Sequence, residues 1–161
     1  MLHNLMSAQE VLEAHWDGDV PVRPIAIAQA MGIQVFKSID LGCSGQISVL
    51  DGGEVELIFN DGEPLVRKRF TVAHEIGHFA LGHLSESTRL FRDEVAAFSS
   101  KVRDPKEVQA NRFAAQLLMP ADALRLAIQQ GGKTISQLAE MFRVSEVAMK
   151  FRLINLGMLR G

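Results

Sequence analysis

The spacing of apolar residues changes once along this 161-residue chain, near residue 60, and that change constrains the fold most. Before it, apolar and polar residues alternate in short runs at 33–39, 47–49 and 55–59, the two-residue period of half-buried strands. Asp51-Gly52-Gly53, between the last two runs, is a hairpin turn signal. Beyond residue 64 the period becomes helical. The sequence therefore predicts an α+β fold, with a small antiparallel three-stranded sheet beside a helical body.

Local capping signals set the ends of several predicted helices. Ser7 and Glu10 form a capping box, and Asp104-Pro105 is a good N-cap and first-turn pair. With the apolar spacing, these signals predict helices over 8 to 14 or 16, 25–31, 65–81, 105–118 and 120–130, and a pair of helices within 134–156. The segment 84–104 has no clear period, and we expect either a loop over a site or a short helix there.

Length and composition favour one domain. A chain of this length can bury a core without covalent staples, and its 47% apolar and 22% charged residues are close to the globular average. The single cysteine, Cys43, excludes an intrachain disulfide framework and a Cys-rich zinc ribbon. We expect one domain over 1–161, with 133–157 as a helix-turn-helix-like subregion at its C-terminal end.

The sequence also predicts a cytoplasmic protein that has no contact with a membrane. No apolar stretch approaches the roughly 20 residues that span a bilayer. Glu10 and Glu13 lie where a secretory signal would have its apolar segment.

The string His74-Glu75-Ile76-Gly77-His78, inside the long predicted helix, carries the clearest chemical signal. Residues four apart lie about 40° apart on one face of a helix, so both imidazoles can bind one Zn²⁺. Glu75 is then beside the metal, where it can act as a base on zinc-bound water. Such a string arises by chance in about 1% of shuffled chains of this composition, so two histidines without a metal are the alternative.

A third ligand distinguishes these alternatives. A histidine six residues after His78 is absent, because that position is Leu84. His83 lies beyond the helix-ending Gly82, so we expect it to cap the helix, support the structure or contact a substrate rather than bind metal.

Glu107 is the better candidate for the third ligand. It would complete a two-histidine, one-glutamate site with one position left open for water. Asn111, one helical turn further on, could hydrogen-bond the outer nitrogen of a ligating histidine and fix its tautomer. From spacing alone, an equal alternative is that Glu107 is only a first-turn acid that stabilises its helix.

Two motifs, in this order, resemble the ImmA/IrrE family of metallopeptidases. They are RFTVAHEIGHFALGH at 69–83 and EVQANRFAAQLLMP at 107–120, and the likeness covers roughly residues 20–157. The resemblance implies a gluzincin-like site with one zinc per chain, ligands His74, His78 and Glu107, and Glu75 as general base. It also implies a limited, site-specific cut in a regulatory protein, a helix-turn-helix repressor of a mobile-element, stress or toxin–antitoxin circuit.

The chain departs from the family pattern in two respects. Asn111 stands where many relatives have an acid, so its hydrogen bond to a histidine would be neutral and weaker. The chain has no tyrosine, which excludes a phenolic donor to the tetrahedral intermediate. His83, Arg112 or a backbone N–H would have to stabilise that intermediate.

The predicted helix pair within 134–157 resembles a helix-turn-helix. Lys150 lies on its second helix, where it could contact DNA, whereas Met149 and Leu153 form an apolar stripe for packing. From residue 131 on there are five basic and two acidic residues, which is little for phosphate contacts. Packing is therefore favoured. A non-catalytic relative that controls a repressor by binding, or that binds DNA through these helices, is the alternative function.

Overall fold

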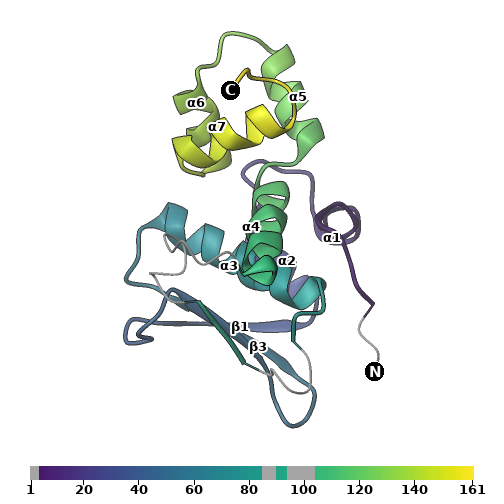
Figure 1. Cartoon of the computed structure of the whole chain (residues 1–161), viewed down its shortest axis with the longest axis vertical. Coiled ribbons are helices and arrows are strands. Elements are labelled where there is room, and N and C mark those ends of the chain that lie inside the picture. The colour runs from purple at the N-terminus through teal and green to yellow at the C-terminus, as the bar shows by residue number, and fades with distance from the viewer. Residues whose placement is uncertain (1–3, 85–89, 94–103) are drawn as a thin grey trace.

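The structure is a computed structural model that describes residues 4–84, 90–93 and 104–161. A small sheet forms one layer, helices α2, α3 and α4 lie on one side of it, and α5, α6 and α7 form the end of the molecule furthest from the sheet (Figure 1). The elements are α1 (Ala8–His15), α2 (Pro24–Ala30), β1 (Ile33–Ser38), β2 (Gly45–Val49), β3 (Val55–Asn60), α3 (Leu65–Ala80), β4 (Leu90–Asp93), α4 (Pro105–Leu118), α5 (Ala121–Gln129), α6 (Ile135–Phe142) and α7 (Glu146–Asn155).

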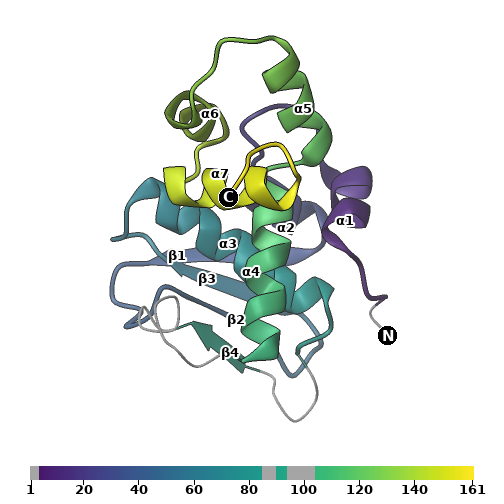
Figure 2. The same cartoon turned by 45° about the horizontal axis from the view of Figure 1, so that its top comes forward.

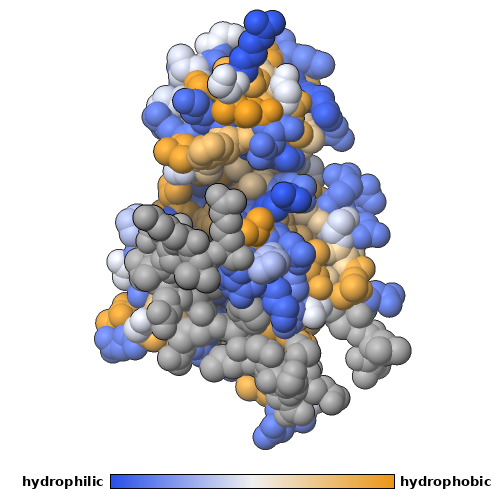
Figure 3. Space-filling view, in the orientation of Figure 1, coloured by the Kyte–Doolittle hydropathy of each residue, from blue (hydrophilic) through white to orange (hydrophobic). Residues whose placement is uncertain are grey.

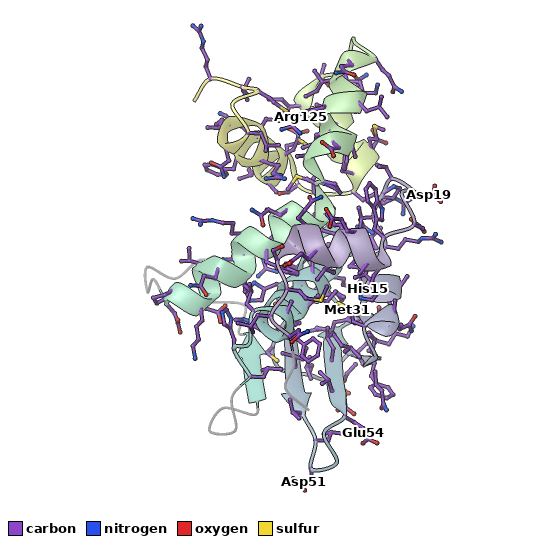
Figure 4. The ribbon with its side chains drawn as sticks, turned by 90° about the vertical axis from the view of Figure 1, so that its right-hand side faces the viewer. His15, Asp19, Met31, Asp51, Glu54 and Arg125 are labelled. Carbon is purple, nitrogen blue, oxygen red and sulfur yellow. The ribbon has the colours of Figure 1, made fainter. Side chains whose placement is uncertain are left out.

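The sheet has four strands in the order β1-β3-β2-β4, and it is mixed. The hairpin prediction is confirmed: β2 and β3 are antiparallel, and the Gly53 N–H donates to the Leu50 carbonyl at 2.8 Å in the turn. Asp51 and Glu54 lie at the tip of this hairpin, directed away from the helices (Figure 4).

The prediction of a purely antiparallel three-stranded sheet is wrong in two respects. First, β1 pairs with β3 in parallel, because β3 lies between β1 and β2 although it follows both in sequence. Second, β4 forms a fourth strand, antiparallel to β2, within the segment for which a loop or a helix was expected. The rest of that segment, 85–89 and 94–103, lies outside the described residues. The α+β class itself is confirmed.

Helix α3 lies at the centre of the molecule, between the sheet and α4. Val72 and Ile76 belong to one core cluster with Ile47 and Leu57 of the sheet. On the α4 side, Gly77 faces Phe113, and a Cβ at position 77 would lie 3.1 Å from the Phe113 side chain. Because α3 is covered on both sides, the helix is buried over most of its second half.

The C-terminal helices are attached to α3 and α4 by two arginines. The Arg69 guanidinium donates to the Val22 carbonyl at 2.7 Å and to the Phe142 and Arg143 carbonyls at 3.4 and 3.2 Å. Arg152 on α7 donates to the Met119 carbonyl, just after α4, at 3.0 Å. These contacts place α7 beside the first part of α3 and the last part of α4 (Figure 2).

The expected helix pair at the C-terminal end is confirmed as α6 and α7. A capping box of Thr134 and Gln137 begins α6, Arg143 adopts a left-handed conformation in the turn, and Ser145 caps α7. None of the helices in residues 4–84 and 104–161 combines the length and the apolarity of a membrane span.

Candidate metal centre

Three side chains that can bind a metal converge between α3 and α4. His74 Nε2 and His78 Nε2 are 3.0 Å apart, Glu107 Oε2 lies 3.0 Å from the first, and Glu107 Oε1 lies 3.1 Å from the second. Donors around a tetrahedral Zn²⁺ with bonds of 2.0–2.1 Å are about 3.3 Å apart. The three side chains therefore form a group that could hold one metal ion.

The local sequence accounts for this convergence. The two histidines are one turn apart on α3, which is held close to α4 because position 77 has no side chain. Asp104 caps α4 by accepting a hydrogen bond from the Lys106 N–H, and Pro105 occupies the first turn. Glu107 is therefore in the first turn of α4, at the end that faces the histidines.

The electrostatics of the site keep Glu107 ionised. Burial raises the pKa of the carboxyl, but hydrogen bonds with His74 and His78 outweigh burial and hold the pKa well below its usual range. Both histidine side chains are fully buried, whereas the Glu107 side chain is 22% exposed. An ionised carboxylate beside two imidazoles is a typical donor set for a divalent metal.

Glu75 is fully buried on the sheet side of α3. Its Oε1 lies 3.4 Å from the position that a Cβ on Gly45 would take, and Thr71 Cγ2 would be only 2.5 Å from that Cβ. A side chain at position 45 would therefore collide with α3. Glycine at the start of β2 lets this strand approach Glu75 closely.

The structure places His83 behind a ligand candidate and adds Gln109, which sequence reasoning did not consider. His78 Nδ1 lies 2.8 Å from His83 Nδ1, and His83 Nε2 lies 2.9 Å from Gln109 Oε1. An amide oxygen only accepts, so His83 donates from Nε2 and accepts at Nδ1 from the His78 Nδ1–H. With its Nδ1 engaged by His83, His78 can bind a metal only through Nε2, the nitrogen that faces Glu107.

The end of α3 explains how His83 reaches His78. Gly82 has a positive φ of 73°, and the His83 N–H donates back to the His78 carbonyl at 2.9 Å. The chain therefore folds back over the last turn, and the His83 side chain is almost completely buried. In the sequence, a histidine directly after a helix-ending glycine was the signal that could have indicated this contact.

The structure does not bring the other two sequence candidates into contact with the histidines. Among the described residues, no hydrogen bond joins Asn111 to His74 or His78, and its buried Oδ1 has no partner there. Asn111 lies a turn beyond Glu107, next to Phe70 in a groove toward α7. Arg112 is exposed on α4.

Two histidines and a glutamate on two packed helices, with a glutamate directly after the first histidine, define a metallopeptidase-like domain. The chain belongs to the family of the IrrE N-terminal-like domain, peptidase family M78, whose model matches residues 28–154. This match confirms the resemblance to the ImmA/IrrE family.

Two known proteins show how far the similarity extends. Metallopeptidase ImmA of Bacillus subtilis (strain 168) is 27% identical over 150 residues, which cover 92% of this chain and 83% of the relative. A solved Mycobacterium tuberculosis transcriptional regulator matches with a TM-score of 0.57 and 19% identity over 81% of this chain. The chain spans only 40% of that regulator, so this second likeness concerns the fold.

Proposed function

We propose that this protein is a zinc-dependent metalloendopeptidase, with one zinc per chain held by His74, His78 and Glu107. The observation that supports it best is the convergence of three side chains from two packed helices, with contacts of 3.0–3.1 Å between their nitrogen and oxygen atoms. Imidazole nitrogen with a carboxylate favours zinc over magnesium or calcium, which prefer oxygen ligands. When bound, zinc would polarise a peptide carbonyl and lower the pKa of a water to about 7.

In this proposal Glu75 moves the proton. Its carboxylate accepts a proton from the attacking water and delivers it to the nitrogen of the leaving amine. The burial of Glu75 against β2 keeps its carboxylate in one place through both transfers. Asn111, the other site candidate, is proposed below to bind the substrate.

The proposed substrate is a transcriptional regulator, a helix-turn-helix repressor of a mobile-element or stress circuit, cut at one site. Support comes from the family, from the name of the relative ImmA and from the fold shared with a transcriptional regulator. Such a substrate requires the protein to act in the cytoplasm. We also propose that residues 1–161 act as one domain, because Arg69 and Arg152 attach the C-terminal helices to α3 and α4.

Glu75→Gln tests the mechanism. Glutamine keeps the shape of the side chain but cannot accept the proton, so the cleavage rate should fall at least about 10²-fold while zinc stays bound. The measurement is cleavage of candidate helix-turn-helix repressors from the same genome, together with zinc content by elemental mass spectrometry.

Glu107→Gln is the matched control, since it should lose zinc as well as activity. Full activity of Glu75→Gln would rule out this mechanism. An effect on transcription that survives Glu75→Gln would instead identify a protein that controls the repressor by binding.

A further inference from the structure

A groove of about 750 Å³ lies between the first part of α3, the last part of α4 and α7. Its volume is within the range of roughly 300–1,000 Å³ that is typical of ligand sites. Val66 and Phe70 of α3 and Asn111 and Ala115 of α4 line one side, and Val147 and Phe151 of α7 line the other.

The groove begins one helical turn from the candidate metal centre on both α3 and α4. Two rows of residues spaced four apart lead from the centre into it, and such residues share one face of a helix. The rows are Val66, Phe70 and His74 on α3, and Ala115, Asn111 and Glu107 on α4. The Phe70 ring centroid lies 6.3 Å from that of His74. A chain extended from the metal centre along these rows would therefore enter the groove.

The lining of the groove has a specific chemistry. Val147 and Phe151 are 65% and 62% exposed, which is unusual for neighbouring apolar side chains on one helix face. Figure 3 shows hydrophobic side chains gathered over the region of α7. Among the described residues that line the groove, the charged ones are Arg67, which also pairs with Glu63 at 3.4 Å, and Arg152, and none is acidic.

Asn111 adds a polar group at the end nearest the metal centre. Its Oδ1 is buried and has no hydrogen-bond partner among the described residues. A buried acceptor without a donor is costly, and the backbone N–H of a bound polypeptide would satisfy it.

We propose that this groove binds the substrate polypeptide on one side of the cleaved bond and selects a segment that combines apolar side chains with an acidic residue. The apolar side chains pack on Phe70, Val147 and Phe151, and the acidic residue pairs with an arginine of the lining. This inference rests on the proposed function. It assigns α7 to substrate recognition within the metallopeptidase, and not to DNA.

The test separates binding from cleavage. Zinc-loaded Glu75→Gln protein is used to select binders from a display library of random dodecapeptides. Enriched peptides should combine apolar residues with Asp or Glu. Their affinity should fall at least about tenfold in a protein that also carries Val147→Glu, because a carboxylate would then face apolar and acidic side chains. Leu126→Glu, at a similarly exposed aliphatic position on α5 outside the groove, should leave the affinity unchanged.

A second variant tests the charge preference. Arg67→Gln should weaken binding of the acidic peptides but not of the same peptides with the acid replaced by its amide. Equal losses for both peptides would contradict the proposed role of charge.

Other results would contradict the proposed role of the groove or the peptidase function. If no peptide is enriched, or if the Glu75→Gln protein binds the enriched peptides equally well with and without Val147→Glu, the inference is wrong. If the protein forms a dimer or a DNA complex that Val147→Glu disrupts and Leu126→Glu does not, the groove binds that partner instead of the substrate. This result would overturn the inference. Peptides that bind in the groove but that the wild type never cuts would contradict the peptidase function alone. If the wild type and Val147→Glu cut the peptides equally fast, the peptidase function stands and only the proposed role of the groove is contradicted.

Discussion

His83 lies behind His78, on the side of that ring away from Glu107. Its Nδ1 lies 2.8 Å from His78 Nδ1, so it holds the orientation and the tautomer of that ring. We expect His83→Ala to lower zinc affinity about 10- to 100-fold, the usual effect of removing such a partner. The measurement is a competition titration against a chromophoric chelator, with circular dichroism to check the fold.

A histidine outside the site provides the control for this prediction. His15, at the end of α1, should tolerate alanine with unchanged zinc affinity. His83→Asn, which keeps a hydrogen-bonding group, should recover part of the loss. Wild-type affinity in His83→Ala would mean that the contact with His78 does not orient the ligand.

At the level of elements, the distance between α3 and α4 determines whether the three donors meet. A Cβ at position 77 would lie 3.1 Å from the Phe113 side chain, so Gly77→Ala should push the two helices apart. Overpacking of this kind typically costs about 1–3 kcal/mol, which exceeds the gain of about 1 kcal/mol from better helix propensity. Urea denaturation should show lower stability, and zinc should bind more weakly. A more stable variant with unchanged zinc affinity would contradict this account.

The attachment of the C-terminal helices depends on Arg69. Its guanidinium donates hydrogen bonds to three carbonyls from two segments, and such charged bonds are worth about 1.5–3 kcal/mol each when one partner is lost. Only the bond to the Val22 carbonyl, at 2.7 Å, is short, so we expect Arg69→Met to lower the free energy of unfolding by about 2–4 kcal/mol in total. Arg125→Met is the control, because among the described residues Arg125 forms an ion pair with exposed Asp122 on its own helix at 2.9 Å. Figure 4 labels Arg125 on α5. Similar thermal unfolding of the two variants would show that Arg69 does not hold the C-terminal helices.

The elements also show why some features could be predicted from sequence and others could not. Helices α1, α4 and α6 begin at capping residues whose partners are two or three positions away, so the signal is local. The alternation of apolar and polar residues identifies the strands but does not show which strands pair. The parallel pairing of β1 with β3 arises because β3, the later strand, lies between β1 and β2.

Some residues of the candidate site could likewise be predicted from sequence, and others could not. His74, Glu75 and His78 follow from spacing on one helix, and Glu107 from a motif. The contact of His83 with Gln109 joins residues 26 positions apart, and no local pattern indicates it. The position of Asn111 likewise depends on how α4 lies against α3 and α7. The roles of all these residues as ligands and base stay predictions.

For the molecule as a whole, stability should depend on zinc. An ion that binds only the folded state stabilises it by about 4 kcal/mol at a free concentration 1,000 times its dissociation constant. We therefore expect a chelator to lower the melting temperature by roughly 8–16 °C, since 1 kcal/mol corresponds to about 2–4 °C for a chain of this size. Differential scanning calorimetry measures the shift. Glu107→Ala should melt at one temperature with or without the chelator; a chelator effect that persists in this variant would place the ion elsewhere.

The position of Glu107, 29 residues after His78, has a consequence for the life of the protein in the cell. A shared ion would act as a reversible cross-link that closes the chain between α3 and α4, comparable in chain entropy to a disulfide worth about 3–4 kcal/mol. When zinc is scarce, only packing would join these two helices, and the unfolded fraction exposed to housekeeping proteases would rise. Zinc starvation would then reduce the amount of this protein as well as its activity.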